Sequence, residues 1–152
     1  MSIILQLLRP GDIAVLERVA PGVFDGPVVP ALAAAFLSDS RHHIVVALDA
    51  GTVVGMITAV DYIHPDKAPQ LWINEVGVSP AYQRGGIGRR LLRAMLDHGR
   101  RLGCTEAWLG TESENLAARR LYEDAGSVAQ SFILYEFPLA AGPLPPPADG
   151  EL

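Results

Sequence analysis

A glycine-rich turn between an expected strand and an expected helix holds the residues best suited to chemistry. Its sequence is Q-R-G-G-I-G, from Gln83 to Gly88, and it joins an apolar run over 71–78 to a helical segment over 88–102. Three glycines let several backbone N–H groups point toward one place, and the helix N-terminus adds a partial positive charge. Such a turn is suited to a phosphate or pyrophosphate, which indicates a nucleotide-bearing cofactor.

The turn differs from the two best-known phosphate-binding motifs. The chain contains no G-x-x-x-x-G-K-S/T segment, and G-x-G-x-x-G fails because Leu91 stands where the third glycine would follow Gly86 and Gly88. The pattern that remains is Q-x-x-G-x-G. A glycine turn that serves only the tight packing of a strand against a helix is the alternative interpretation of the same residues.

Hydrophobic periodicity and turn residues predict the elements that position this turn. Strands are expected at 3–8, 44–48, 53–60, 71–78, 104–109 and 132–137, and helices at 10–20, 27–37, 88–102 and 115–125. The strands at 44–48 and 53–60 form a hairpin, and the helix between the strands at 71–78 and 104–109 makes that pair a parallel crossover. The sequence therefore predicts an α/β domain with a mixed sheet and flanking helices.

The composition is that of one ordinary globular domain. Of the 152 residues, 49% are hydrophobic and 19% are charged, and no apolar run is as long as the ~18–20 residues of a membrane span. A single domain over 1–137 is expected, followed by a flexible tail over 138–152, because that stretch contains five prolines. Cys104 is the single cysteine, which excludes an internal disulfide framework, and residues 1–8 lack the basic region of a signal peptide. We therefore expect a cytoplasmic protein.

The charges are unevenly distributed along the chain. The formal net charge of −5 argues against general nucleic-acid binding. Eight of the 12 Lys and Arg residues nevertheless fall between Arg84 and Arg120, where they could face cofactor phosphates, and the acidic remainder could attract a cationic second substrate. A solvated charged face without a ligand explains the helix arginines equally well. The four histidines have neither zinc-ligand spacing nor a cysteine partner, so no metal is expected.

The segment from Asn74 to Tyr82, followed by the Q-x-x-G-x-G turn, resembles the acetyl-CoA signature of the GNAT N-acetyltransferases. The order of the expected elements over residues 3–137 is also that of the GNAT fold. The resemblance implies an acetyl-CoA-dependent enzyme whose two central parallel strands splay apart around the pantetheine arm. The residues that it implies for acetyl-CoA binding are Val76, Gly77, Val78, Gln83, Arg84, Gly85, Gly86, Ile87, Gly88, Arg89 and Asn115.

Two of these positions have a more specific expectation. Gly77 stands where a side chain would crowd an approaching ligand backbone, although a glycine that eases a strand bulge is compatible with the same position. By resemblance, the N–H near Val76 would stabilise the oxyanion that develops on the thioester carbonyl.

Acetyl transfer to an amine requires two proton movements, and one residue is a candidate for each. Glu75 lies in an otherwise apolar strand, where burial would raise its pKa and favour deprotonation of the attacking amine. A paired or solvent-facing carboxylate is the alternative for this residue. Tyr122 lies in the segment from Asn115 to Gly126, which resembles the GNAT helix whose tyrosine hydroxyl reaches the thioester sulfur. A tyrosine that only packs in the core is the alternative.

The expected acceptor is a small cationic amine. The stretch from His64 to Lys67, followed by Leu71 to Val78, looks like the GNAT subgroup of aminoglycoside 3-N-acetyltransferases, which implies a role in antibiotic resistance. Asp61, Asp66 and Glu75 are the candidates for contacting such an acceptor. Another small amine, a protein or peptide amine, and a non-catalytic acetyl-CoA-binding module are the alternatives. The resemblance also implies that a homodimer can form.

Overall fold

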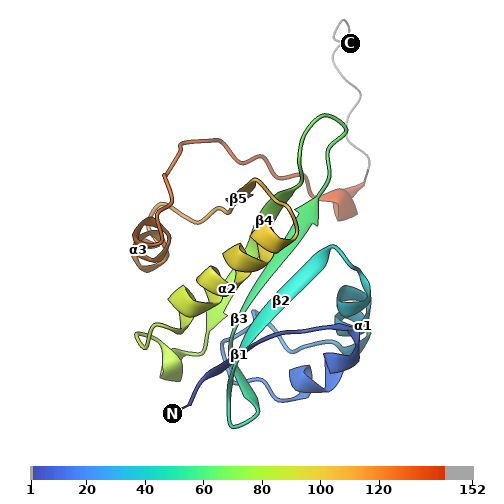
Figure 1. The fold of residues 1–152 in the computed structure, drawn as a ribbon, viewed down its shortest axis with the longest axis vertical. Coiled ribbons are helices and arrows are strands. Elements are labelled where there is room, and N and C mark those ends of the chain that lie inside the picture. The colour runs from blue at the N-terminus through green and yellow to red at the C-terminus, as the bar shows by residue number, and fades with distance from the viewer. Residues whose placement is uncertain (1, 143–152) are drawn as a thin grey trace, which may run out of the picture.

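A five-stranded sheet forms the centre of the protein (Figure 1). The structure is a computed structural model that describes residues 2–142. The strands lie side by side in chain order: β1 (Ile4–Leu7), β2 (His42–Asp49), β3 (Thr52–Tyr62), β4 (Gln70–Val78) and β5 (Glu106–Trp108). The first four strands are antiparallel to one another, pair by pair, whereas β5 is parallel to β4. The predicted mixed sheet is confirmed.

The hairpin between β2 and β3 follows from the residues at its turn. Ala50 and Gly51 both have positive φ angles, 46° and 80°, as a tight two-residue turn matched to the twist of the strands requires. Both strands are apolar along most of their length and largely buried, because helices cover the sheet on both sides. The predicted hairpin is confirmed and forms the middle of the sheet.

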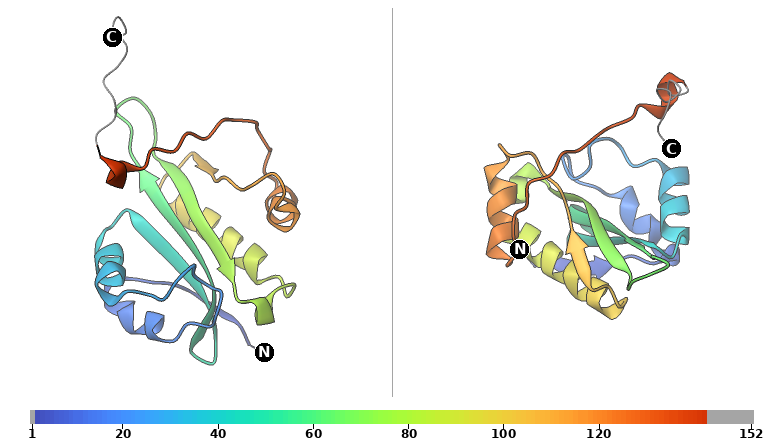
Figure 2. Two further views of the ribbon diagram at one scale, coloured as in Figure 1. Left: turned by 180° about the vertical axis from the view of Figure 1, so that it is seen from behind. Right: turned by 90° about the horizontal axis from the view of Figure 1, so that it is seen from above.

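Helices cover the two faces of the sheet (Figure 2), and each face has its own cluster of buried side chains. The helical elements are η1 (Pro10–Glu17), α1 (Pro30–Ser38), η2 (Pro80–Tyr82), α2 (Ile87–Arg101), α3 (Leu116–Asp124) and η3 (Leu139–Ala141), of which η1, η2 and η3 are 3-10 helices. α2 and α3 lie on one face, which we call the α2 face, and η1 and α1 lie on the other, the α1 face. Leu91 and Met95 belong to the cluster on the α2 face, and Leu37 and Met56 belong to the cluster on the α1 face.

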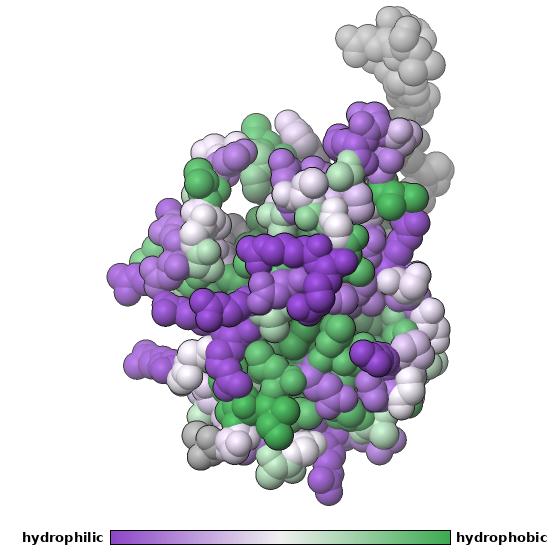
Figure 3. Space-filling view, in the orientation of Figure 1, coloured by the Kyte–Doolittle hydropathy of each residue, from purple (hydrophilic) through white to green (hydrophobic). Residues whose placement is uncertain are grey.

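α2 is amphipathic and packs closely on the sheet. Leu91, Leu92 and Met95 are buried, whereas the arginines point into solvent and contribute to a hydrophilic band over the helix (Figure 3). Gly99 permits close packing, because a β-carbon there would lie 2.9 Å from Cδ2 of Leu71 in β4. The predicted amphipathic helix is confirmed and begins one residue earlier than expected.

The strand predicted at 132–137 is wrong, because this segment is unpaired in the structure. Its large apolar side chains are 59–78% exposed: Phe132, Ile133, Leu134, Tyr135 and Phe137. The composition favours a strand, but a strand also needs a partner. β5 contains only three residues and the chain leaves the sheet after Trp108, so β5 offers too short an edge for pairing.

Other boundaries differ in smaller ways. The helix predicted at 10–20 is a 3-10 helix that ends at Glu17, and the helix predicted at 27–37 begins only at Pro30. The strand predicted at 104–109 is confined to Glu106–Trp108. Residues 143–152, most of the predicted flexible tail, lie outside the described residues. Within residues 2–142, no helix combines the length and the apolar character that crossing a bilayer requires.

Candidate active site

β4 and β5 pair over a short stretch and then separate. The paired residues are Gln70 with Glu106, Leu71 with Ala107, and Trp72 with Trp108. Beyond them, no strand among residues 2–142 lies beside β4 on this side, so the edge from Ile73 to Val78 is free of sheet hydrogen bonds there. Val76, Gly77 and Val78 lie on this edge, where backbone N–H and C=O groups can bind a ligand instead of a strand. The predicted splaying of the parallel pair is confirmed.

The turn after β4 leads into an open helix N-terminus. Arg84 and Gly86 have φ angles of 65° and 80°, so both lie in the left-handed region. Gly86 is the N-cap of α2, it offers no side-chain cap, and a β-carbon there would meet nothing within 4 Å. The first backbone hydrogen bond of α2 runs from the Arg90 amide to the Gly86 carbonyl, 3.1 Å. The N–H groups of the first turn therefore point into open space and can bind an anion.

Side chains around this turn hold its shape more than they extend into it. The Gln83 carboxamide donates a hydrogen bond to the Val78 carbonyl, 3.1 Å, and so ties the turn to the end of β4. Arg89 donates to Asp124 of α3, 3.0 Å, and Arg90 donates to the carbonyl of Ile3, 2.9 Å. The guanidinium groups of both arginines thus connect α2 to other elements, which leaves the backbone amides as the main anion-binding groups of the turn.

Gly88 brings α3 against the first turn of α2. A β-carbon at Gly88 would lie 3.3 Å from Cδ2 of Leu121, so a larger residue would push α3 away. The alternative interpretation of the turn, tight packing, therefore accounts for this glycine. Gly86, which has open space around it, is not explained in that way.

Tyr122 lies next to Leu121 on α3 and faces the region where β4 and β5 separate. It is half-buried and lines a cavity of about 290 Å³ together with Ile73 of β4, Cys104 and Leu109. Burial raises the pKa of the Tyr122 hydroxyl, so this group stays protonated at neutral pH and can donate a proton. Burial also raises the pKa of the Cys104 thiol, which argues against Cys104 as a nucleophile.

Asn115 stands at the beginning of α3. Its side-chain oxygen accepts a hydrogen bond from the Ala118 amide, 3.1 Å, as expected of an N-cap residue. The NH₂ group of the same side chain can still donate a hydrogen bond to a ligand. Asn115 therefore fixes the start of the helix that carries Tyr122.

Glu75 is exposed, so the prediction that it is buried in an apolar strand is wrong. The register between β3 and β4 shifts at this point: Thr58 pairs with Glu75 and Ala59 with Ile73, which leaves Asn74 as an extra residue in β4. In the part of the chain that the structure describes, no strand covers the other side of β4 here. Burial therefore does not mark Glu75 as a base, although the residue does lie beside the free edge.

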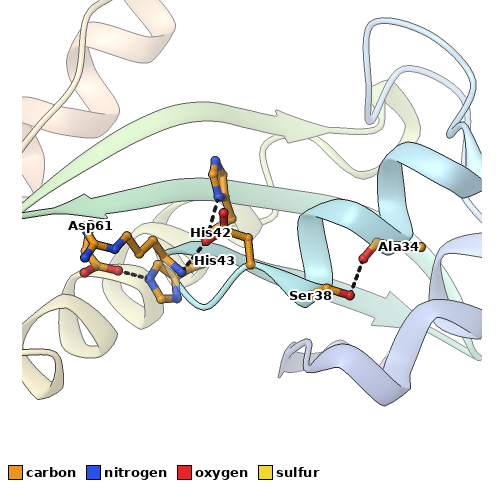
Figure 4. A network of polar contacts seen from close by, with 7 residues as sticks. Ala34, Ser38, His42, His43 and Asp61 are labelled. Atoms are coloured by element: carbon orange, nitrogen blue, oxygen red, sulfur yellow. Dashed lines mark hydrogen bonds and ion pairs between the residues drawn. The ribbon is translucent and has the colours of Figure 1, made fainter.

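The structure places Asp61 away from Glu75. Asp61 pairs with Leu71, a residue of the cluster on the α2 face, and its carboxylate lies 2.6 Å from Nε2 of His43 (Figure 4). Thr58, the partner of Glu75, stands three positions before Asp61 in β3, and this odd spacing puts the two acidic side chains on opposite faces of the sheet. Asp66 is exposed in the loop between β3 and β4.

Two side-chain groups near the site escaped prediction. Asp61, His43 and His98 form a hydrogen-bonded chain between the sheet and α2, with 2.9 Å between Nε2 of His98 and Nδ1 of His43. An aromatic cluster, which we define as Tyr62, His64, Trp72 and Trp108, forms at the ends of β3, β4 and β5. Both groups consist of residues far apart in the chain, and the signal that could have found them is strand pairing: β2 with β3 for Asp61 and His43, and β4 with β5 for Trp72 and Trp108. Among residues 2–142, no group of three or more His, Cys, Asp or Glu side chains is arranged to hold a metal ion.

Comparison with known proteins relates the chain to one family. Residues 14–126 match the family model described as the Acetyltransferase (GNAT) family. The N-alpha-acetyltransferase RimI of Mycobacterium tuberculosis is 36% identical over 104 residues, which are 68% of this chain and 63% of that protein. A mycothiol acetyltransferase of Saccharopolyspora erythraea is 41% identical over 61 residues, 40% of this chain and 20% of that protein. The chain thus spans less than two thirds of the length of either relative.

Solved structures share the fold at lower sequence identity. An aminoglycoside acetyltransferase from an uncultured soil metagenomic sample has a TM-score of 0.77 and 20% identity, covering 91% of this chain and 99% of that chain. A ribosomal-protein-alanine N-acetyltransferase from Brucella melitensis biovar Abortus 2308 has a TM-score of 0.69 and 19% identity, covering 90% of this chain and 100% of that chain. The predicted GNAT fold is therefore confirmed.

Proposed function

Because residues 14–126 match its model, the chain belongs to the acetyltransferase (GNAT) family, and we propose that it is an N-acetyltransferase that moves the acetyl group of acetyl-CoA to a primary amine of a small cationic molecule. One observation carries the proposal: the open N-terminus of α2 and the half-buried Tyr122 both adjoin the region where β4 and β5 separate. An anion-binding turn and a protonated acid thus flank one free strand edge.

The residues present fit acetyl-CoA as the first substrate. Arg84, Gly85 and Gly86, with the amides of Ile87, Gly88 and Arg89, would bind its diphosphate, because open backbone N–H groups at a helix N-terminus suit that charge. Gln83 would support the turn through its bond to Val78. The edge at Val76, Gly77 and Val78 would pair with the pantetheine arm, and the Asn115 carboxamide would bind the same arm.

The chemistry needs a base, an oxyanion donor and an acid. Glu75 would take a proton from the attacking ammonium group, directly or through water, so that the amine nitrogen can form its bond to the acetyl carbon. The N–H near Val76 would stabilise the negative charge on the carbonyl oxygen. As the carbon–sulfur bond breaks, the Tyr122 hydroxyl would give its proton to the thiolate, the acylated nitrogen would lose its second proton to water, and Tyr122 and Glu75 would return to their starting protonation states by exchange with water. The place of Tyr122 on the cavity beside the separating strands supports this assignment, and its raised pKa means that the hydroxyl is protonated before that step.

The acceptor class that we favour is an aminoglycoside, acetylated at the 3-N position, in keeping with a role in antibiotic resistance. The supporting observations are the exposed carboxylates of Glu75 and Asp66 and the acidic balance of the chain outside 84–120. Asp61 does not support this acceptor class, since its carboxylate contacts His43 on the opposite face of the sheet. A homodimer remains an expectation of the family resemblance.

A specific observation favours a second candidate. The relative from Mycobacterium tuberculosis is an N-alpha-acetyltransferase, and a 51-residue stretch is 41% identical to an Escherichia coli enzyme that acetylates the alanine of ribosomal protein bS18. A protein or peptide N-terminus would present one reacting ammonium group on an extended backbone. The exposed surface around Glu75 leaves room for such a chain.

Free-thiol detection with acetyl-CoA and a panel of amines tests the proposal. We expect thiol release with kanamycin or gentamicin and none with peptides that begin with alanine, and product analysis would identify the acetylated nitrogen. Release with the peptides alone would favour the second candidate. Binding of acetyl-CoA without release with any amine would identify a non-catalytic acetyl-CoA-binding module and overturn the proposed enzyme.

A further inference from the structure

The aromatic cluster lies on the same face of the sheet as Glu75. Thr58, Val60 and Tyr62 alternate along β3 and therefore share one face. Their partners across β4 are Glu75, Trp72 and Gln70, in that order. Trp72 in turn pairs with Trp108 of β5. A continuous strip of one sheet face thus runs from the candidate base to the aromatic cluster.

The rings of the cluster are inclined to one another. Trp72 and Trp108 meet edge to face with centroids 4.5 Å apart and an interplanar angle of 79°. Tyr62 lies 6.4 Å from Trp108 at 57°, and His64 lies 5.0 Å from Tyr62 at 67°. Inclined rings keep part of their electron-rich faces accessible, in contrast to a parallel stack.

A chain of hydrogen bonds fixes these rings and ends at a carboxylate. The Trp108 indole donates to the Tyr62 hydroxyl, 2.7 Å, and that hydroxyl donates to the Gln70 side-chain oxygen, 3.2 Å. The Gln70 NH₂ group donates to Glu106, 2.9 Å, while the Gln70 oxygen also lies 3.0 Å from Nε2 of His64. The aromatic surface and the Glu106 carboxylate are therefore positioned before any ligand arrives.

The cluster is an accessible surface and not a second core. Trp108 is 51% exposed, Glu106 is exposed, and Tyr62 and Trp72 are half-buried. Over residues 2–142, no member of the aromatic cluster belongs to either of the two buried clusters of the sheet. Accessible aromatic faces next to a carboxylate attract an organic cation, through the ring quadrupole and through the negative charge.

We infer that the aromatic cluster and Glu106 bind a second ammonium group of the acceptor while its reacting amine lies at Glu75. Trp72 and Glu75 pair with Val60 and Thr58, which are two positions apart in β3, and this corresponds to about 7 Å of strand. An acceptor with two cationic groups at roughly that separation can contact both sites. The inference rests on the proposed function for the reacting end, but the binding of a polyamine by the cluster can be measured without turnover.

Tryptophan fluorescence is a selective probe of this site, because the two tryptophans of the chain are both in the cluster. We expect spermidine, which carries several ammonium groups, to change the fluorescence in a saturable way, and n-butylamine to bind at least tenfold more weakly. Glu106→Gln should weaken spermidine binding about threefold, as expected of one partly screened charge. Trp108→Leu should weaken it about tenfold, measured through Trp72.

A matched control separates the local carboxylate from the overall charge. Glu17→Gln removes an exposed carboxylate at the end of η1. This carboxylate is far from the cluster, because Val19, two residues later, pairs with Val53 at the end of β3 opposite to Tyr62. The variant should therefore bind spermidine as the wild type does. Equal responses to spermidine and n-butylamine, no saturable response, or equal effects of the Glu17 and Glu106 variants would overturn the inference. Saturable spermidine binding by a protein that releases thiol with no amine of the panel would overturn the proposed enzyme and leave the cation site supported.

Discussion

Gly77 of β4 lies directly beneath the carbonyl oxygen of Val23, so close that no β-carbon fits between the strand and that loop. From the sequence, a ligand backbone is expected to occupy the space next to Gly77. In the structure the backbone before α1 fills it instead, and it does so on the face that Gly77 shares with Glu75, which stands two positions earlier in β4. Gly77 is thus required by the protein's own packing, and the loop above it forms a boundary of the candidate acceptor surface.

Gly77→Ala should therefore destabilise the protein. The added methyl group must displace the Val23 carbonyl, and overpacking of this kind costs about 1–3 kcal/mol of the free energy of unfolding. Urea unfolding measures the change. Gly11→Ala is the control, because a β-carbon at Gly11 meets nothing within 4 Å, and it should change stability by less than about 0.5 kcal/mol. Equal stability of the two variants would contradict the close approach.

Gly86→Val should weaken acetyl-CoA binding before it affects anything else. The branched side chain would enter the space in front of the α2 amides, where the diphosphate is proposed to bind. Calorimetry with CoA measures the loss of affinity. The substitution also strains the backbone, because Gly86 has a φ of 80°.

Gly103→Val is a control for that strain. Gly103 has a φ of 85°, open space around it, and a position beyond the opposite end of α2. Both variants should lose similar stability, of order 1 kcal/mol, but only Gly86→Val should lose affinity for CoA. Wild-type affinity in Gly86→Val would mean that the diphosphate binds elsewhere.

The sequence predicted those features that local residues determine. The helical spacing of Leu91, Leu92 and Met95 specifies α2, and Ala50–Gly51 specifies the hairpin. Each signal consists of residues that are close together in the sequence. The glycine turn before α2 is local in the same sense. Its predicted position at the end of β4 is also observed.

Features that depend on strand register could not be predicted in this way. The exposure of Glu75 results from the extra residue Asn74 in β4 and from the early end of β5 at Trp108. The same early end leaves 132–137 without a partner despite its strand-like composition. The side of the sheet on which Asp61 lies also follows from pairing, and a shift by one residue would have put it beside the candidate acceptor surface.

Tyr122→Phe should lower kcat by roughly 10²–10⁴, the usual contribution of one general acid, with little change in the affinity for acetyl-CoA. The phenyl ring keeps the packing against the cavity between α2, α3 and β5, so stability should change little. Thiol release under saturating substrates measures kcat. Tyr135→Phe is the matched control, because Tyr135 is 75% exposed, and its kcat should be that of the wild type. An unchanged kcat in Tyr122→Phe would leave this tyrosine a packing residue only.

The hydrogen-bonded chain of Asp61, His43 and His98 should make stability depend on pH. The Asp61 carboxylate accepts from Nε2 of His43, which leaves Nδ1 of His43 to accept from Nε2 of His98. Both histidines cannot be protonated while this chain is intact, because two N–H groups would then face each other. Burial lowers the pKa of His98, helped by the nearby charges of His43 and Arg101 and opposed by Asp61.

The sign of the effect follows from the lowered pKa. Because the unfolded chain takes up this proton near pH 6.5 and the folded protein only at lower pH, acid favours the unfolded state. The free energy of unfolding should be highest above about pH 6.5 and fall as the pH drops toward 5. Urea unfolding of the wild type and of His98→Asn at several pH values measures this. The free energy of unfolding of the variant should depend less steeply on pH. His42→Asn removes an exposed histidine paired with Asp39 and serves as the control. Its free energy of unfolding should fall between about pH 6.5 and 5 as steeply as that of the wild type. An identical pH slope in His98→Asn and in the wild type would show that His98 is not the titrating group.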